Sequence, residues 1–155
     1  MITSGLFSSA TPEWATPQDL YNTLDAEFGF ELDPCATHDN HKAPKYYTKE
    51  DDGLAQDWGT LRTFINPPYG REIGKWVRRA REHAEGGGLA VALLPARTDT
   101  AWWGDVMKAD EIRFIRGRVH FGGASTGAPF PSCIVIWGIP RVPTIKVIDR
   151  MGAPL

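Results

Sequence analysis

The sequence has 155 residues, a formal net charge of −2 and two distant cysteines, Cys35 and Cys133. A chain of this length can bury a core without disulfides or metal ions, so we expect residues 1–155 to form one compact domain. The cysteine spacing excludes a CxxC metal or redox motif, and the lack of a long apolar run excludes a membrane-spanning helix or secretory leader. We therefore expect a soluble protein of the cytoplasm with no membrane partner.

The charge is divided along the chain. Through Asp57 there are 11 acidic and 3 basic residues, a charge of −8, whereas from Trp58 onward there are 14 basic and 8 acidic residues, a charge of +6. This asymmetry predicts a cationic or polyhydroxyl ligand on the first half and a polyanion on the second. Chance variation along a mixed surface explains it equally well.

Helical and strand-like patterns alternate from the start of the chain, which predicts an α/β fold. Thr16 is a typical N-cap, Pro17 suits the first helical position, and Gly29 ends a helix with one apolar face. Apolar and polar residues then alternate over 30–33, which predicts a short strand that Pro34 stops.

The later elements follow the same alternation. The apolar face of residues 72–84 predicts a helix, and the apolar run 89–94 predicts a central parallel strand covered on both faces. A hairpin-like return places residues 133–137 antiparallel at the sheet edge, before a tail that wraps the body. The other predicted elements are short strands at 46–48, 62–65, 111–115 and 118–121 and a helix at 100–109.

The tetrapeptide Asn66-Pro67-Pro68-Tyr69 follows the predicted strand 62–65. Its side-chain and backbone carbonyls can accept hydrogen bonds from an exocyclic amine, which turns the amine lone pair away from the ring and toward a methyl donor. The prolines hold the backbone in place, and the tyrosine offers a ring on which a flipped base can stack. The motif predicts methyl transfer to a planar amine, with a rigid strand-ending turn as the alternative.

Two further motifs are expected beside the tetrapeptide, because ligands of parallel sheets bind beyond the carboxyl ends of the strands. They are Asp33-Pro34-Cys35-Ala36 and residues 95–100. Asp33 can accept hydrogen bonds from a ribose or a methionine amino group, or it can cap the following turn. Asp57 and Trp58 can bind an adenine edge and ring, or they can form a turn beside a buried tryptophan.

Four stretches, residues 13–17, 27–34, 66–70 and 94–102, resemble the phage and prophage DNA adenine methyltransferases in one consistent order. The resemblance implies a class I, Rossmann-like methyltransferase fold with a mostly parallel sheet and an antiparallel edge strand. It also implies S-adenosylmethionine as cofactor and methylation of the exocyclic amine of adenine in double-stranded DNA.

The resemblance also implies roles for individual residues. The tetrapeptide Asn66, Pro67, Pro68 and Tyr69 matches the catalytic motif. The glycine-rich turn of many methyltransferases is missing after Pro34, so Asn40 is added as a polar candidate at the same place. The expected cofactor-binding residues are Thr16, Pro17, Asp33, Pro34, Asn40, Asp57 and Asn66.

The chain is too short for a separate target-recognition domain, so recognition must come from loops, a partner or a homodimer. The expected DNA contacts are Arg71, Lys75, Arg97 and Arg118. For the first two, a solvated basic helix face is an equal alternative. Arg118, with Arg116 and His120, precedes a Gly-Ser-Thr-Pro loop that can close over DNA, although strand-surface charges have the same pattern.

Three other interpretations remain open. Cys35, His38 and His41, with Asp39 nearby, have a spacing that can bind a metal ion, but methyl transfer needs none and we predict no metal. A methyltransferase acting on a protein glutamine amide would face the same planar amine. A DNA-binding protein that keeps the fold without turnover would share every motif.

Overall fold

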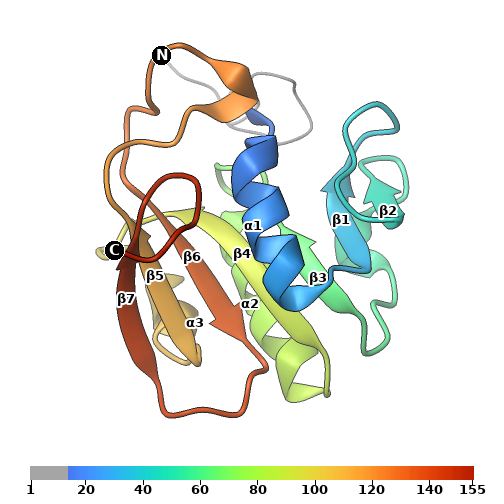
Figure 1. The fold of residues 1–155 in the computed structure, drawn as a ribbon. Helices are drawn as coiled ribbons and strands as arrows, with labels where there is room; N and C mark the ends of the chain where they lie inside the picture. The colour runs from blue at the N-terminus through green and yellow to red at the C-terminus, as the bar shows by residue number, and fades with distance from the viewer. Residues whose placement is uncertain (1–13) are drawn as a thin grey trace.

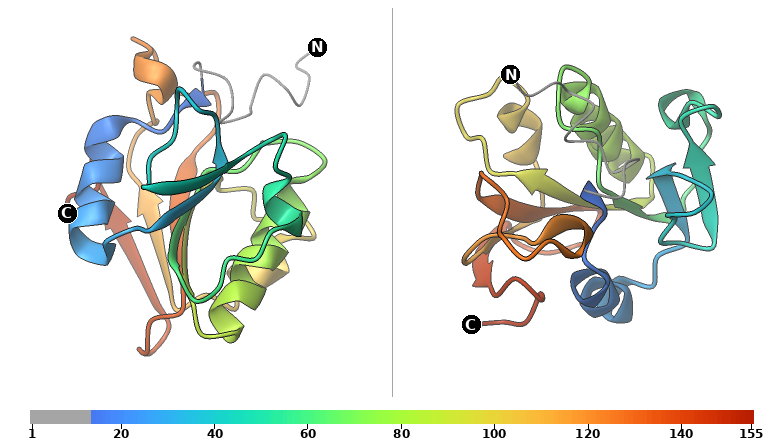
Figure 2. Two further views of the ribbon diagram at one scale, coloured as in Figure 1. Left: turned by 90° about the vertical axis from the view of Figure 1, so that its right-hand side faces the viewer. Right: turned by 90° about the horizontal axis from the view of Figure 1, so that it is seen from above.

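A computed structural model describes residues 14–155, so that Glu13 of the resemblance lies outside the described part. A seven-stranded sheet runs through it in the order β2-β1-β3-β4-β6-β5-β7 (Figure 1). Helix α1 covers one face of the sheet, and α2 and α3 cover the other (Figure 2). The strands are β1 (Leu32–Ala36), β2 (Lys45–Thr48), β3 (Arg62–Ile65), β4 (Leu89–Pro95), β5 (Glu111–Ile115), β6 (Ser132–Trp137) and β7 (Thr144–Ile148). The helices are α1 (Gln18–Phe28), α2 (Ile73–Glu85) and α3 (Trp103–Val106), with short 3-10 turns η3 (Gly53–Ala55) and η4 (Phe121–Gly123).

The predicted α/β fold with a mostly parallel sheet is confirmed, and one strand, β6, runs antiparallel to both of its neighbours. Its predicted place at the sheet edge is wrong. The segment expected to be a wrapping tail forms β7, which pairs parallel with β5 and takes the edge. All six residues of β6 are buried, as its continuous apolar sequence requires of a strand covered on both faces.

Several local predictions are corrected. Thr16 does not cap α1, because the cap position is Pro17 and no side chain caps it. Pro34 lies inside β1, where the pairing with β2 shifts register between Asp33 and Ala36 and so tolerates a residue without an N–H group.

The predicted helix at 100–109 shortens to α3. Hydrogen bonds three residues apart, such as Trp103 N to Thr100 O, produce successive tight turns around it, and Gly104 is a poor helix former. The predicted strand at 118–121 is absent, and the 3-10 turn η4 begins at Phe121 in a segment rich in glycine.

The buried centre of the molecule is β4, whose seven residues are all buried between the two helical layers. Strands β1, β3 and β4 are parallel neighbours, so their carboxyl ends meet at one edge of the sheet. The residues that follow them in sequence are the three motifs expected to share a site. No helix in residues 14–155 is long and apolar enough to span a membrane.

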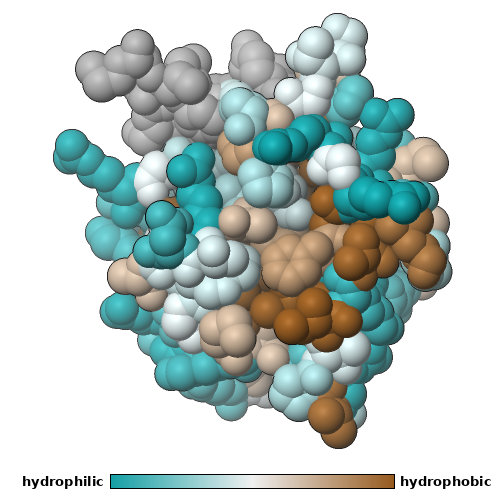
Figure 3. All heavy atoms as spheres, turned by 90° about the vertical axis from the view of Figure 1, so that its left-hand side faces the viewer, coloured by the Kyte–Doolittle hydropathy of each residue, from teal (hydrophilic) through white to brown (hydrophobic). Residues whose placement is uncertain are grey.

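The edge strand β7 differs from the interior strands because apolar side chains remain exposed on it. Ile145 is 65% exposed and Val147 is 49% exposed. They pair with Ile112 and Phe114 of β5 and therefore extend the same face of the sheet. Figure 3 shows this side of the molecule, with apolar side chains gathered next to hydrophilic ones.

Candidate active site

The site begins with Asn66, the first residue after β3. Its side chain is almost fully buried, and its Nδ2 donates hydrogen bonds to the backbone oxygen of Trp14 and to Oγ1 of Thr16, each at 3.0 Å. A backbone carbonyl can only accept, so the amide nitrogen must face Trp14 and the amide orientation is determined. Both amide hydrogens are used, which leaves Oδ1 as an acceptor without a hydrogen-bond partner in residues 14–155.

Thr16 links this asparagine to the start of α1. Residues 16 and 66 are 50 positions apart in sequence, yet the Thr16 hydroxyl accepts a hydrogen bond from the Asn66 amide. Thr16 as a whole is 4% exposed. A small cleft beside them brings together four of the predicted site residues. It is lined by Thr16, Asp33, Cys35, Asn40, Lys42, Phe64 and Asn66.

The rest of the tetrapeptide is held firmly in place. Pro67 is buried, and the hydroxyl of Tyr69 donates a hydrogen bond to the backbone oxygen of Leu93 at 2.9 Å. Burial raises the pKa of that hydroxyl well above its ordinary value, so it remains a donor. The ring meets Phe121 and Phe130 edge to face, with centroid distances of 6.1 and 5.6 Å. Its role as a platform for a flipped base stays a prediction.

Asp33 is a buried residue that lines the small cleft. Its Oδ1 accepts a hydrogen bond from the Cys35 N–H at 3.2 Å, and its Oδ2 accepts one from the Lys42 N–H at 3.0 Å. Burial raises the pKa of the carboxyl to about 6, and the two backbone hydrogen bonds partly oppose that rise. Asp33 therefore closes the loop after β1, as the turn-capping alternative predicted, and its contact with a cofactor stays a prediction.

Asp57 and Trp58 do not reach the site. Trp58 is completely buried, with its Nε1 donating to the backbone oxygen of Gly53 at 2.8 Å. Asp57 is exposed and accepts the Gly59 N–H at 2.8 Å, which makes a turn. The alternative of a turn beside a buried tryptophan is therefore confirmed, and adenine cannot stack on Trp58 here because the interior of the protein covers the ring. Asp57 lines neither cavity, so its role as a cofactor contact stays a prediction.

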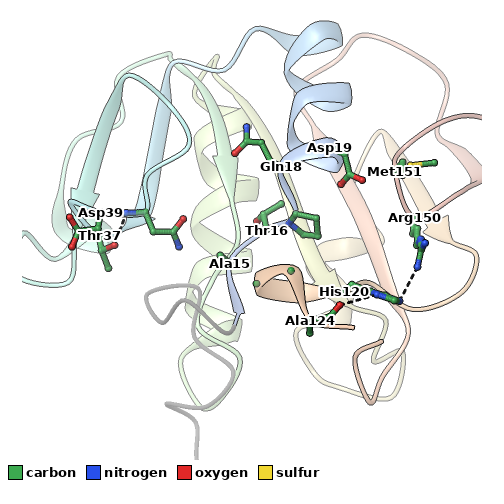
Figure 4. A pocket seen from close by; sticks show the side chains of 14 residues that line it. Ala15, Thr16, Gln18, Asp19, Thr37, Asp39, His120, Ala124, Arg150 and Met151 are labelled. Carbon is green, nitrogen blue, oxygen red and sulfur yellow. Dashed lines mark hydrogen bonds between the residues drawn. The ribbon is translucent and has the colours of Figure 1, made fainter. Parts of the chain in front are cut away.

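A second, larger cavity of about 950 Å³ adjoins the small cleft (Figure 4). The two share Thr16 and Asn40, so the larger cavity continues toward Asn66. Its volume falls in the range of cavities that hold cofactor-sized molecules. The lining residues are Ala15, Thr16, Pro17, Gln18, Asp19, Thr37, Asp39, Asn40, His120, Gly122, Gly123, Ala124, Arg150 and Met151.

Sequence reasoning missed part of this lining. In the sequence, Asp19 has only the signal of an acid in the first turn of a helix, and Asp39 only that of a neighbour of His38 and His41. Arg150 carries no sequence signal, because it belongs to the segment expected to be a tail. Pro34 is buried inside β1 and lines neither cavity, so its expected contact with the cofactor stays a prediction.

The predicted DNA contacts lie outside the cavities. Arg97 is exposed after β4, with its guanidinium 5.8 Å from the centre of the Phe130 ring. Lys75 is exposed and forms an ion pair with Glu72 at 3.1 Å. Arg71 and Arg118 are also exposed, the first just before α2 and the second before η4. Contact of these four residues with DNA stays a prediction.

The alternative of a metal site finds no support in residues 14–155, where no three His, Cys, Asp or Glu side chains are grouped to hold an ion. The suspected ligands make other contacts. The His38 ring bonds the Tyr46 hydroxyl at 2.8 Å, and the His41 ring stacks on the Tyr46 ring at 4.1 Å.

The mostly parallel sheet with one antiparallel strand is consistent with a Rossmann-like methyltransferase fold. The family model described as DNA N-6-adenine-methyltransferase (Dam) matches residues 4–140. The chain belongs to this family.

Two curated relatives carry the name DNA N-6-adenine-methyltransferase. The protein of Escherichia phage T1 is 33% identical over 105 residues, which cover 66% of this chain but only 44% of the phage protein. The protein of Haemophilus phage HP1 is 30% identical over 118 residues, which cover 74% of this chain and 68% of the phage protein.

Proposed function

We propose that the protein transfers a methyl group from S-adenosylmethionine to the exocyclic amine of adenine in double-stranded DNA. The observation that carries this proposal is the orientation of Asn66. Its amide nitrogen is bonded to Trp14 and Thr16, and its Oδ1 is left as an acceptor at the carboxyl end of β3.

This geometry addresses the main difficulty of the reaction. The amine of adenine is a weak nucleophile because its lone pair is delocalised into the ring. Hydrogen bonds from the amine to Asn66 Oδ1 and to the Pro67 carbonyl favour a pyramidal nitrogen whose lone pair points out of the ring plane. Because Thr16 and Trp14 hold the amide before substrate arrives, no free energy is needed to orient it during the reaction.

The residues of the larger cavity fit the proposed cofactor. S-adenosylmethionine, when bound, supplies a methyl group activated by a sulfonium. Asp19 and Asp39 give part of the cavity negative charge, which suits a ligand with a sulfonium and an ammonium group. Thr16 and Asn40 line both that cavity and the small cleft of Asn66, so they would contact the cofactor close to the reacting methyl group, and Pro17 would contact it from the larger cavity.

Asn66 and the Pro67 carbonyl would hold the adenine amine for direct attack on the methyl group that a bound cofactor would supply. The neutral thioether would be the leaving group, and the methylated amine would lose one proton to solvent. Asn66 accepts a hydrogen bond throughout and takes no proton, because a neutral amide is not basic enough to act as the base.

The experiment incubates the protein with methyl-labelled S-adenosylmethionine and either adenine-containing duplex DNA or a bacterial protein extract. We expect label in the DNA, recovered as N6-methyladenine, and none in the extract. A duplex made only of G·C pairs is the matched control. Label on a protein glutamine amide would overturn the proposal in favour of that rival, and absence of label from both would favour a DNA-binding protein without turnover.

The same proposal includes the cytoplasm of a bacterium or phage-infected cell as the site of action, because the substrate is there. The homodimer and the single-domain organisation stay predictions.

A further inference from the structure

The wall of the larger cavity opposite Thr37 and Asp39 contains two basic side chains, His120 and Arg150 (Figure 4). His120 precedes the 3-10 turn η4, and Arg150 follows the edge strand β7. The family match ends at residue 140, so Arg150 belongs to a segment that the match does not cover.

A well-defined turn presents Arg150 to the cavity. Oδ1 of Asp149 accepts hydrogen bonds from the N–H groups of Met151 and Ala153, both at 2.9 Å. Gly152 has φ +93, and a Cβ at this position would lie 3.0 Å from the Thr23 side chain of α1. The turn therefore packs closely against α1 and holds the arginine backbone at a determined place.

The contact between the two basic residues assigns their hydrogens. Nη1 of Arg150 lies 2.9 Å from Nε2 of His120, and a guanidinium can only donate, so Nε2 is the acceptor. The hydrogen of the ring is then on Nδ1, which donates to the backbone oxygen of Ala124 at 3.1 Å. His120 thus orients the guanidinium without neutralising its charge.

Arg150 keeps most of its binding capacity. Its side chain is exposed, and none of the ion pairs within residues 14–155 includes it, although Asp19 lines the same cavity. A guanidinium has five N–H donors in a planar fork that matches two oxygens of one anion. An oriented arginine without a carboxylate partner, at the rim of a cavity, is a suitable site for an oxyanion.

We propose that Arg150, oriented by His120, binds an oxyanion of the ligands that enter the cavity. The proposal rests on the proposed function, which offers two sources of this chemistry, a phosphodiester of the target DNA strand and the carboxylate of the cofactor. The exposure of Arg150 at the rim favours the phosphodiester, because the polymer remains outside the cavity while a single base enters it.

The experiment titrates three ligands into the full-length protein. Inorganic phosphate is followed by the NMR shift of the His120 ring, S-adenosylmethionine by calorimetry, and an adenine-containing duplex by fluorescence anisotropy at several salt concentrations. The variants are Arg150→Ala, Arg150→Lys and the matched control Lys108→Ala, which removes an exposed positive charge that lines neither cavity.

We expect Arg150→Ala to abolish the phosphate-dependent shift of His120 and to weaken duplex binding on the order of tenfold, the effect of one lost charge-assisted hydrogen bond. The plot of log affinity against log salt concentration should become shallower, with the magnitude of its negative slope reduced by about 0.9, the value for one phosphate contact. Arg150→Lys should keep part of the affinity, since it keeps the charge but loses the fork. Lys108→Ala should match the wild type.

A loss of cofactor affinity instead of duplex affinity would support the subsite and identify its ligand as the carboxylate. Unchanged binding of all three ligands by Arg150→Ala would overturn the subsite. A wild-type protein that transfers no methyl group to DNA, yet still shows the phosphate-dependent shift, would overturn the proposed function and leave the subsite standing.

Discussion

The small cleft around Asn66 and the wall of the larger cavity around Arg150 are built differently. In the small cleft, Asn66, Thr16 and Asp33 are buried and hydrogen-bonded, and Asn66 is bonded to Thr16 across 50 positions of the sequence. On the wall around Arg150, the basic side chains lie on two loops and the guanidinium is exposed. The first arrangement suits an acceptor that must keep one orientation during a reaction. The second suits contact with a charged ligand that approaches from solvent.

This difference has a physical reason. A buried amide bonded at both hydrogens cannot rotate without breaking two hydrogen bonds in a medium where unpaired polar groups are costly. An exposed arginine can adjust to a ligand, because water satisfies its donors in the free protein. Substitutions in the small cleft around Asn66 should therefore change the chemical step, and substitutions on the exposed surface should change binding and its salt dependence.

The largest expected effect comes from Asn66→Ala. This variant removes the acceptor for the substrate amine, so single-turnover methyl transfer should fall on the order of 10²–10³-fold, as when one oriented polar group is removed from other active sites. Calorimetry should show S-adenosylmethionine affinity within a few-fold of the wild type. Transfer at the wild-type rate would remove Asn66 from the mechanism.

The second prediction concerns the buried carboxyl of Asp33. Its pKa is raised from 3.8 to about 6 in the folded protein, so the folded state binds the proton more tightly than the unfolded state. Protonated Asp33 therefore adds about 3 kcal/mol to the free energy of unfolding below pH 3.8. This contribution is lost as the pH rises through 6.

Urea unfolding of the wild type and Asp33→Asn at several pH values checks this prediction. The asparagine does not titrate, so the wild type should lose stability relative to the variant between pH 4 and 7 by about that amount. A stability difference that does not change with pH would contradict the role of burial at this carboxyl.

A smaller effect is expected for Thr16→Val, which keeps the side-chain shape but removes the hydroxyl that accepts the Asn66 amide hydrogen. The loss of one hydrogen bond, about 1 kcal/mol, should lower kcat about fivefold while KM for DNA changes little. Thr16→Ser keeps the hydroxyl and should restore kcat. A change in KM alone would indicate that Thr16 contacts substrate and does not position Asn66.

The smallest effect is expected for Arg97→Ala, on the exposed surface beside Phe130. If Arg97 contacts one phosphate, the magnitude of the slope of log duplex affinity against log salt concentration should decrease by about 0.9. The value of kcat should remain unchanged. Fluorescence anisotropy at several salt concentrations measures the slope, with Lys108→Ala as the control. An unaltered slope would exclude Arg97 from the DNA contact.

The sequence predicted the elements that local patterns determine. The tetrapeptide lies after β3 as expected, and the continuous apolar run of β4 is indeed buried on both faces. The contact between Thr16 and Asn66 could not be predicted, because it joins distant segments and a threonine before Pro17 is equally typical of a helix cap. The placement of β7 at the edge depends on tertiary pairing that has no local signal.

The burial of individual side chains also could not be predicted from the sequence. Trp58 follows an acid before a strand, a pattern that suits both a ligand platform and a core residue, and only the packing around it distinguishes the two. Arg150 has no motif at all, since its position follows from the turn that Asp149 and Gly152 form against α1.

The most direct test of the central claim is nucleoside analysis by mass spectrometry of DNA from cells that express the wild-type protein or Asn66→Ala. The oriented asparagine predicts N6-methyladenine in DNA from cells with the wild type and a loss of nearly all of it with the variant at equal protein levels. Equal amounts of N6-methyladenine in both, or methylation of cytosine in place of adenine, would contradict the account.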